Sequence, residues 1–180
     1  MRRASVFIII MVVELFLLVG CSNEKQISLT ADEEVAENYV KSKGYKIISY
    51  DGKSEPFTID REMMATSPYR EIWSLQQVAP ELYYGKSITT YSFIVSNSPL
   101  EKKYASLYKK WDWGTSVNIM VTEGKVIGGT SAPFDKSGTS GVMAGGSYSI
   151  DGLTQEEITG LSYSEWFEEW NKKYREYPSS

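Results

Sequence analysis

Three short motifs in the middle of the chain have serine and lysine spacings that could activate a nucleophile. A lysine beside a serine can take up the hydroxyl proton, so such a set would suit acyl transfer through a serine ester. Serine and lysine are common residues, the motifs fall within one short stretch, and the middle motif lies in a predicted strand. We therefore interpret them as chance matches and predict no catalytic residue. The motifs are Ser106-Leu107-Tyr108-Lys109, Ser116-Val117-Asn118 and Lys136-Ser137-Gly138.

The residues that most catalytic and metal sites use are missing from this sequence. It contains no histidine, and its one cysteine is Cys21. Ser-His catalysis, Cys-His catalysis and histidine-ligated zinc are therefore excluded, and no disulfide can form within one chain. A catalyst built from this sequence would have to use carboxylate, lysine, tyrosine or serine side chains alone.

Five glutamates near the C-terminus and a glycine-rich segment, 138–146, are the remaining candidates for a metal or phosphate site. A calcium site needs oxygen ligands spaced around a glycine-hinged turn, and a phosphate loop needs a lysine and a following helix. The sequence has neither pattern at these positions. We predict a solvated helix face, a surface loop, and no metal or cofactor. The glutamates are Glu156, Glu157, Glu165, Glu168 and Glu169.

Aromatic residues are abundant, with 13 Tyr, 6 Phe and 5 Trp. Most of them recur on the apolar stripes of predicted helices and strands, which favours core packing. Tyr83 and Tyr84 differ because they lie in a predicted loop beside Gly85. Aromatic rings at a surface can stack on a ligand, so Tyr83 and Tyr84 are the predicted binding contacts.

The first 21 residues have the three parts of an export signal: a basic start, an apolar stretch and a cleavage site. Arg2 and Arg3 precede an apolar run that ends in Leu18-Val19-Gly20-Cys21. An aliphatic residue three before a cysteine, with smaller residues between, resembles the lipobox of bacterial lipoproteins. A membrane-spanning helix would need about 20 apolar residues, whereas this run is shorter and is interrupted by Glu14.

The lipobox resemblance implies cleavage before Cys21, a lipid on the Cys21 sulfur, and anchoring on the extracytoplasmic face of the cell membrane. We therefore predict a signal peptide at 1–20, a lipidated tether at 21–29 and a single domain at 30–178. Removal of residues 1–20 takes away two of the 19 basic and one of the 23 acidic residues, so the net charge changes from −4 to −5. Nucleic acid favours basic surfaces, and we predict no nucleic-acid partner.

Apolar periodicity in the first part of the domain predicts a helix followed by two strands. Thr30 and Glu33 match a capping box at the start of the helix, and Gly44 suits its end. The segments 45–50 and 56–59 are predicted to form strands around a turn at Asp51-Gly52.

The remaining elements are short and alternate between strand and helix patterns. For 69–78 we favour a strand, although the spacing of Tyr69, Trp73 and Gln77 also suits a helix. The whole pattern predicts one α+β domain, in which helices pack on an antiparallel sheet. The expected elements after residue 59 are a helical turn capped by Asp60, strands at 69–78 and 86–96, a helix at 99–111, a hairpin of 116–122 and 125–131, a turn at 154–158, and a last helix capped by Ser162 with Glu165.

Several segments together resemble a family of uncharacterised Gram-positive lipoproteins that share a domain of unknown function. The likeness extends over roughly residues 35–130 and does not include the last predicted helix. It implies a compact domain of helices and a sheet on an exported protein, and it implies no activity and no site residues. The segments are Tyr39–Tyr45, Tyr84-Gly85-Lys86, Tyr91–Val95, Asn97-Ser98-Pro99 and Gly124–Gly129.

These observations favour a non-catalytic binding or regulatory module of the cell envelope. Its expected partners are the membrane, through the lipid anchor, and an envelope protein or wall component. The alternative is a small hydrolase that uses paired carboxylates. A cleft with two carboxyls, one of raised pKa, would favour the hydrolase, whereas an apolar or aromatic patch would favour the binding module.

Overall fold

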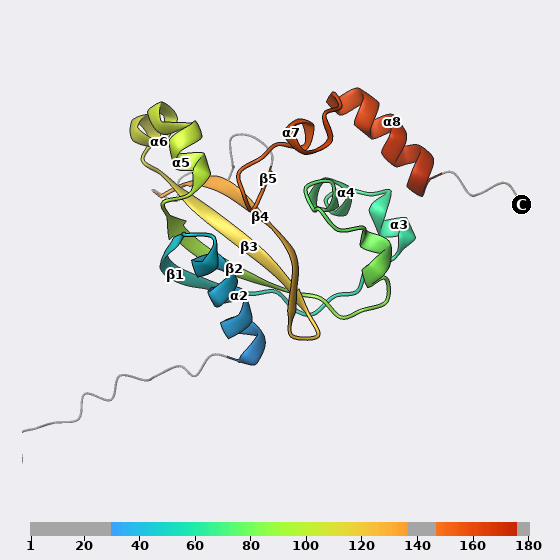
Figure 1. Ribbon diagram of the computed structural model, residues 1–180, viewed down its shortest axis with the longest axis horizontal. Coiled ribbons are helices and arrows are strands. Elements are labelled where there is room, and N and C mark those ends of the chain that lie inside the picture. Colours follow the sequence, from blue (N-terminus) through green and yellow to red (C-terminus); the bar gives the residue numbers. More distant parts are fainter. Residues whose placement is uncertain (1–29, 137–146, 176–180) are drawn as a thin grey trace, which may run out of the picture.

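The computed structural model describes residues 30–136 and 147–175 and contains a five-stranded antiparallel sheet (Figure 1). Each strand pairs with the next one along the chain, so the order in the sheet is β1-β2-β3-β4-β5. Helices pack on this sheet in one compact domain, which confirms the predicted α+β fold. The strands are β1 (Lys46–Lys53), β2 (Thr89–Ser96), β3 (Trp113–Thr122), β4 (Lys125–Asp135) and β5 (Tyr148–Ser149).

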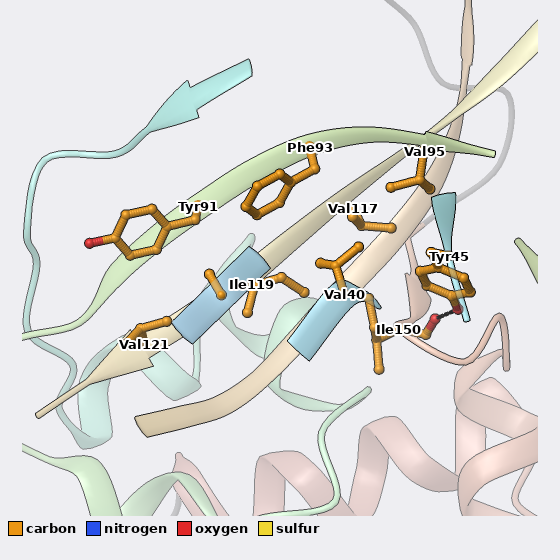
Figure 2. Close-up of a cluster of buried hydrophobic side chains, with 10 residues drawn as sticks. Val40, Tyr45, Tyr91, Phe93, Val95, Val117, Ile119, Val121 and Ile150 are labelled. Carbon is orange, nitrogen blue, oxygen red and sulfur yellow. Dashed lines mark hydrogen bonds between the residues drawn. The ribbon is translucent and has the colours of Figure 1, made fainter. Parts of the chain in front are cut away.

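One face of the sheet is apolar and is covered by α2 (Ala31–Ser42). The predicted capping box is present: Thr30 Oγ1 accepts from the Glu33 amide, and the Glu33 carboxylate accepts from the Thr30 amide. Alternate residues of β2 and β3 point toward α2, as strand geometry requires. Figure 2 shows this first core, whose buried members are Ala36, Val40, Tyr45, Tyr91, Phe93, Val95, Val117, Ile119, Val121 and Ile150.

A second core forms where helical segments pack on the opposite face of the sheet. Met120 contributes to this core because it alternates along β3 with the first-core residues Ile119 and Val121. The segments are α3 (Arg61–Met64), α4 (Tyr69–Trp73), the 3-10 turn η2 (Pro80–Tyr83) and α8 (Tyr163–Tyr174). The buried members are Ile59, Met64, Trp73, Ile88, Met120, Ile127 and Tyr174.

The helix predicted over 99–111 is interrupted in the structure. It consists of α5 (Pro99–Lys103) and α6 (Ala105–Trp111), and Tyr104 between them has φ −119° and ψ 34°. The Tyr104 ring lies 5.7 Å from the Tyr148 ring of β5, centroid to centroid. This contact between distant parts of the chain takes precedence over the local helical pattern.

Three predictions in the first half of the domain were wrong. The segment 56–59 does not form a strand and makes two isolated bridges, Phe57 with Ile88 and Ile59 with Tyr84. The chain does not turn back at Asp51-Gly52: β1 continues through both residues, and Gly52, with φ +109°, lies at an irregularity in its pairing with β2. The segment 69–78 is not a strand, because 69–73 forms α4. Helical spacing places Tyr69, Ile72 and Trp73 on one side of α4, where all three contact the second core.

The later elements agree with their predictions. The hairpin of β3 and β4 turns at Glu123-Gly124, where both residues have positive φ. Capping boxes begin α7 (Gln155–Thr159) at Thr154 and α8 at Ser162. In the part of the chain that the structure describes, no helix is both long enough and apolar enough to cross a membrane. The predicted signal peptide lies outside that part.

Candidate functional site

A cavity of about 190 Å³ lies between the second face of the sheet and α4. One side is formed by β2, β3 and β4, and the other by α4 and by Phe57. Small polar side chains on this face of the sheet fill less space than the branched apolar residues of the first face. The lining residues are Phe57, Tyr69, Ile72, Trp73, Thr90, Asn118, Met120, Thr130 and Ser147.

The sheet side of the cavity contains a polar row that crosses three strands. Ser92 of β2 lies opposite Asn118 of β3, which in turn lies opposite Thr130 of β4. Ser92 Oγ donates to Asn118 Oδ1 at 2.7 Å, so the Asn118 Nδ2 group remains as a donor. Among the described residues, neither this Nδ2 group nor the hydroxyls of Thr90 and Thr130 have a hydrogen-bond partner.

The other side of the cavity is aromatic. The rings of Phe57 and Tyr69 lie 6.1 Å apart, and the Trp73 ring lies 5.9 Å from the Tyr83 ring, centroid to centroid. Trp73 is only 2% exposed, and its Nε1 atom is buried without a hydrogen-bond partner in the described structure. A buried donor without a partner costs about 1–3 kcal/mol. The Trp73 ring lines the cavity, whereas its Nε1 atom has almost no accessible surface.

Gln76 connects the segment after α4 to β4. Its Nε2 group donates to the Ile72 carbonyl at 2.7 Å, and its Oε1 atom accepts from the Gly129 amide at 2.9 Å. Gly128 and Gly129 make this approach possible. A Cβ on Gly128 would overlap Gln76 Oε1, and one on Gly129 would lie 2.7 Å from the Asn118 carbonyl oxygen.

Among the described residues that line this cavity, none is charged. Two neighbouring cavities in the described structure each contain one carboxyl group, and each group already has a basic partner. Asp151 lies 2.9 Å from Lys43 Nζ, and Glu71 lies 2.6 Å from Arg70 Nη2. None of these cavities therefore brings together the two carboxyls that a glycosidase-like hydrolysis requires.

A general acid needs a raised pKa, and the surroundings of Glu71 and Glu81 lower the pKa of each carboxyl. Burial raises the pKa of Glu71, but hydrogen bonds from Arg70 outweigh it and hold the pKa below its ordinary value. Glu81 behaves in the same way, with burial opposed by Lys173 and Tyr174. In each case the surroundings favour the charged carboxylate.

The predicted binding contacts Tyr83 and Tyr84 are half-buried and pack against the second core. Tyr83 ends η2 and supports Trp73 from behind the cavity. Burial raises the pKa of Tyr84 to about 12, and its hydroxyl is buried without a hydrogen-bond partner in the described structure. Neither tyrosine lines the cavity, and their role in binding stays a prediction. The predicted lipid-attachment residue, Cys21, lies outside the described residues.

The polar groups considered in the sequence have separate positions and partners. Asn118 lines the cavity, whereas Lys136 pairs with Asp112 at 3.1 Å. Of the five glutamates, Glu157 pairs with Lys103, and Glu165 completes the capping box of α8. The other three are exposed. The described residues contain no group of three or more carboxylate or cysteine side chains that could hold a metal ion.

Sequence reasoning missed the cavity, although part of its signal is present in the strands. Thr90 and Ser92 alternate with the apolar first-core residues of β2, and Asn118 alternates with those of β3. A polar row on the second face is therefore readable from the strand pattern. The helical turn at Tyr69–Trp73 that covers the row was assigned to the wrong class of element, so the cavity between them could not be predicted.

Comparison with known proteins gives no relative for this chain. No family model matches it, and no curated protein and no solved structure matches it either. The resemblance to uncharacterised lipoproteins and the export signal both stay predictions from the sequence.

Proposed function

We propose that this protein is a lipid-anchored module of the extracytoplasmic face of the cell membrane that binds a ligand without transforming it. The cavity under α4 is its binding site. The observation that carries this proposal is a concave site in which aromatic side chains lie beside hydrogen-bonding groups that have no partner among the described residues, such as the Asn118 Nδ2 group. Concave, mostly apolar sites with a few polar groups are the usual form of small-molecule sites.

Two further observations favour binding over hydrolysis. The sequence has no histidine, and its one cysteine is the predicted lipid site. The carboxyls of the neighbouring cavities are held by basic partners, as Asp151 is by Lys43. A binding module needs shape and hydrogen-bond complementarity, and these are what the cavity provides.

The proposed function can be tested with the full-length chain, purified in detergent from a Gram-positive host. The chain is incubated with the small-molecule fraction of host envelopes, and its melting temperature is measured. A ligand that binds only the folded state raises the melting temperature. The fraction is then recovered and its composition compared before and after incubation.

A rise in melting temperature with an unchanged fraction supports a binding module. New products in the recovered fraction would show hydrolysis and overturn the proposal. Tyr69→Ala, which opens the aromatic side of the cavity, should remove the rise. Leu107→Ala is the matched control, because Leu107 is an exposed residue of α6 outside the cavity.

A further inference from the structure

The hydrogen-bonding groups of the cavity define which ligand atoms it can accept. Asn118 Nδ2 can only donate, whereas the hydroxyls of Thr90 and Thr130 can donate or accept. None of the three has a partner among the described residues. The cavity therefore favours a ligand that brings a hydrogen-bond acceptor.

The absence of charged residues from the lining sets the charge of the ligand. Moving an ion from water into a site without an opposite charge is strongly unfavourable. A carboxylate or ammonium ligand would meet no counter-charge on the lining residues, which carry only hydroxyl, amide, indole and apolar groups. An uncharged ligand avoids this cost.

The size of the cavity suits a ligand with one ring inside it. Its volume is about 190 Å³, and an engineered apolar cavity of about 150 Å³ holds one benzene molecule. The rings of Tyr69 and Trp73 and the side chains of Ile72 and Met120 present a mainly apolar surface to such a ring. A sugar of the same size has a hydroxyl on most of its carbon atoms, more than the few polar groups of this lining can pair.

From these three features, and resting on the binding function proposed above, we propose that the cavity under α4 takes an uncharged, single-ring, mainly apolar molecule with a carbonyl-type acceptor. Its acceptor lies against the polar row and receives a hydrogen bond from Asn118 Nδ2. Its ring packs among Phe57, Tyr69 and Trp73. An aromatic or cyclic ketone, ester or amide has this chemistry.

Three probes of nearly equal shape separate the requirements for shape, acceptor and charge. Acetophenone carries a carbonyl group. Isopropylbenzene has a methyl group in place of the carbonyl oxygen, and benzoate has a charged oxygen in place of the methyl group of acetophenone. Binding is followed through the indole N–H signals of the ¹⁵N-labelled full-length chain in detergent. The chain has five tryptophans, and Trp73→Phe identifies the Trp73 signal by its loss.

Acetophenone should shift the Trp73 signal and leave the signal of the exposed Trp111 unchanged. Its affinity should exceed that of isopropylbenzene by at least about threefold, as one net hydrogen bond implies, and benzoate should not bind. In Asn118→Leu the preference for acetophenone should disappear, because isopropylbenzene needs no donor. Ser106→Ala, a change on α6 outside the cavity, should preserve it.

Isopropylbenzene that binds the natural chain as tightly as acetophenone, or more tightly, would overturn the acceptor requirement. Benzoate that binds more tightly than acetophenone would overturn the requirement for an uncharged ligand. A Trp73 shift with N-acetylglucosamine but not with acetophenone would replace the proposed class with a sugar. If no probe binds while the envelope fraction still raises the melting temperature, the ligand class is wrong and the binding function stands. If neither has an effect, both proposals fail.

Discussion

Adjacent glycines in β4 allow two close approaches that no larger residue permits. Gly128 faces the side chain of Gln76, whereas Gly129 lies against the backbone carbonyl of Asn118. The difference matters because a side chain can move away from a new methyl group, and a backbone held in a sheet cannot. The two positions should therefore respond differently to the same substitution.

We expect Gly129→Ala to destabilise the domain by about 1–3 kcal/mol, the range for an inserted methyl group that has no space. Gly128→Ala should also destabilise it, but this loss should shrink when Gln76 is replaced by alanine in the same chain. Urea unfolding of Gly128→Ala, Gln76→Ala and the double variant measures the coupling between the two sites.

Gln76→Ala should not restore the stability of Gly129→Ala, whose clash is with the sheet backbone. Additive effects of Gly128→Ala and Gln76→Ala would contradict the position of Gln76 beside the edge of β4.

At the scale of elements, α8 connects the C-terminal part of the described chain to the second core. Trp170 Nε1 donates to the Met64 carbonyl at 2.6 Å, and the Tyr174 hydroxyl donates to Glu81 at 2.9 Å. Of the aromatic residues of α8, Trp166 and Tyr174 are buried, with 5% and 4% exposed, and Phe167 and Trp170 are half-buried. Tyr163, in the first turn of α8, is the exception, because it is 57% exposed.

Removal of one buried ring of α8 should therefore destabilise the domain. Trp166→Ala should lower the free energy of unfolding by about 3–5 kcal/mol, as other large-to-alanine core changes do. Glu168→Ala, on the exposed side of α8, should change it by less than about 0.5 kcal/mol. Urea unfolding measures both, and wild-type stability in Trp166→Ala would mean that α8 is not a structural brace.

The elements that the sequence predicted well are those whose signals are local. Capping boxes at Thr30, Thr154 and Ser162, and the alternation of β2 and β3, depend on residues a few positions apart. The class of 69–73 and the continuation of β1 through Gly52 depend on contacts with distant segments. The cavity depends on such contacts entirely, because Phe57, α4, β2, β3 and β4 meet only in the folded chain.

At the scale of the whole molecule, buried tyrosines link stability to high pH. Burial, reinforced by the hydrogen bond to Glu81, raises the pKa of Tyr174 above its ordinary value. Burial, reinforced by Asp151, does the same for Tyr45, and it raises the pKa of Tyr84 to about 12. The unfolded chain releases these protons near pH 10, before the folded chain does.

Stability should therefore be complete below about pH 10 and should fall as the pH rises from there through the folded pKa values. Urea unfolding at pH 8.0 and pH 10.5, chosen as values on either side of about 10, measures the loss. Tyr174→Phe should reduce the loss, because it removes one of the groups with a raised pKa. Tyr163→Phe, at an exposed position, should leave it unchanged, and an equal loss in Tyr174→Phe would contradict the assignment.

The position of the domain relative to the membrane follows from the proposed lipid on Cys21. Nine residues, 21–29, separate that sulfur from Thr30 at the start of α2, and an extended chain of this length spans about 30 Å. The domain would therefore stay close to the membrane surface. One acyl chain alone binds a membrane marginally, whereas two or more chains hold firmly, so anchoring should depend entirely on the modification of Cys21.

We expect the wild-type chain, expressed in a Gram-positive host fed a clickable fatty acid, to carry the label and to sediment with membranes. Cys21→Ala should lose the label, because no other cysteine is available. Ser22→Ala is the matched control and should keep both the label and the membrane fraction. Label that persists in Cys21→Ala would exclude the lipobox assignment. The cavity would then no longer be placed near a membrane.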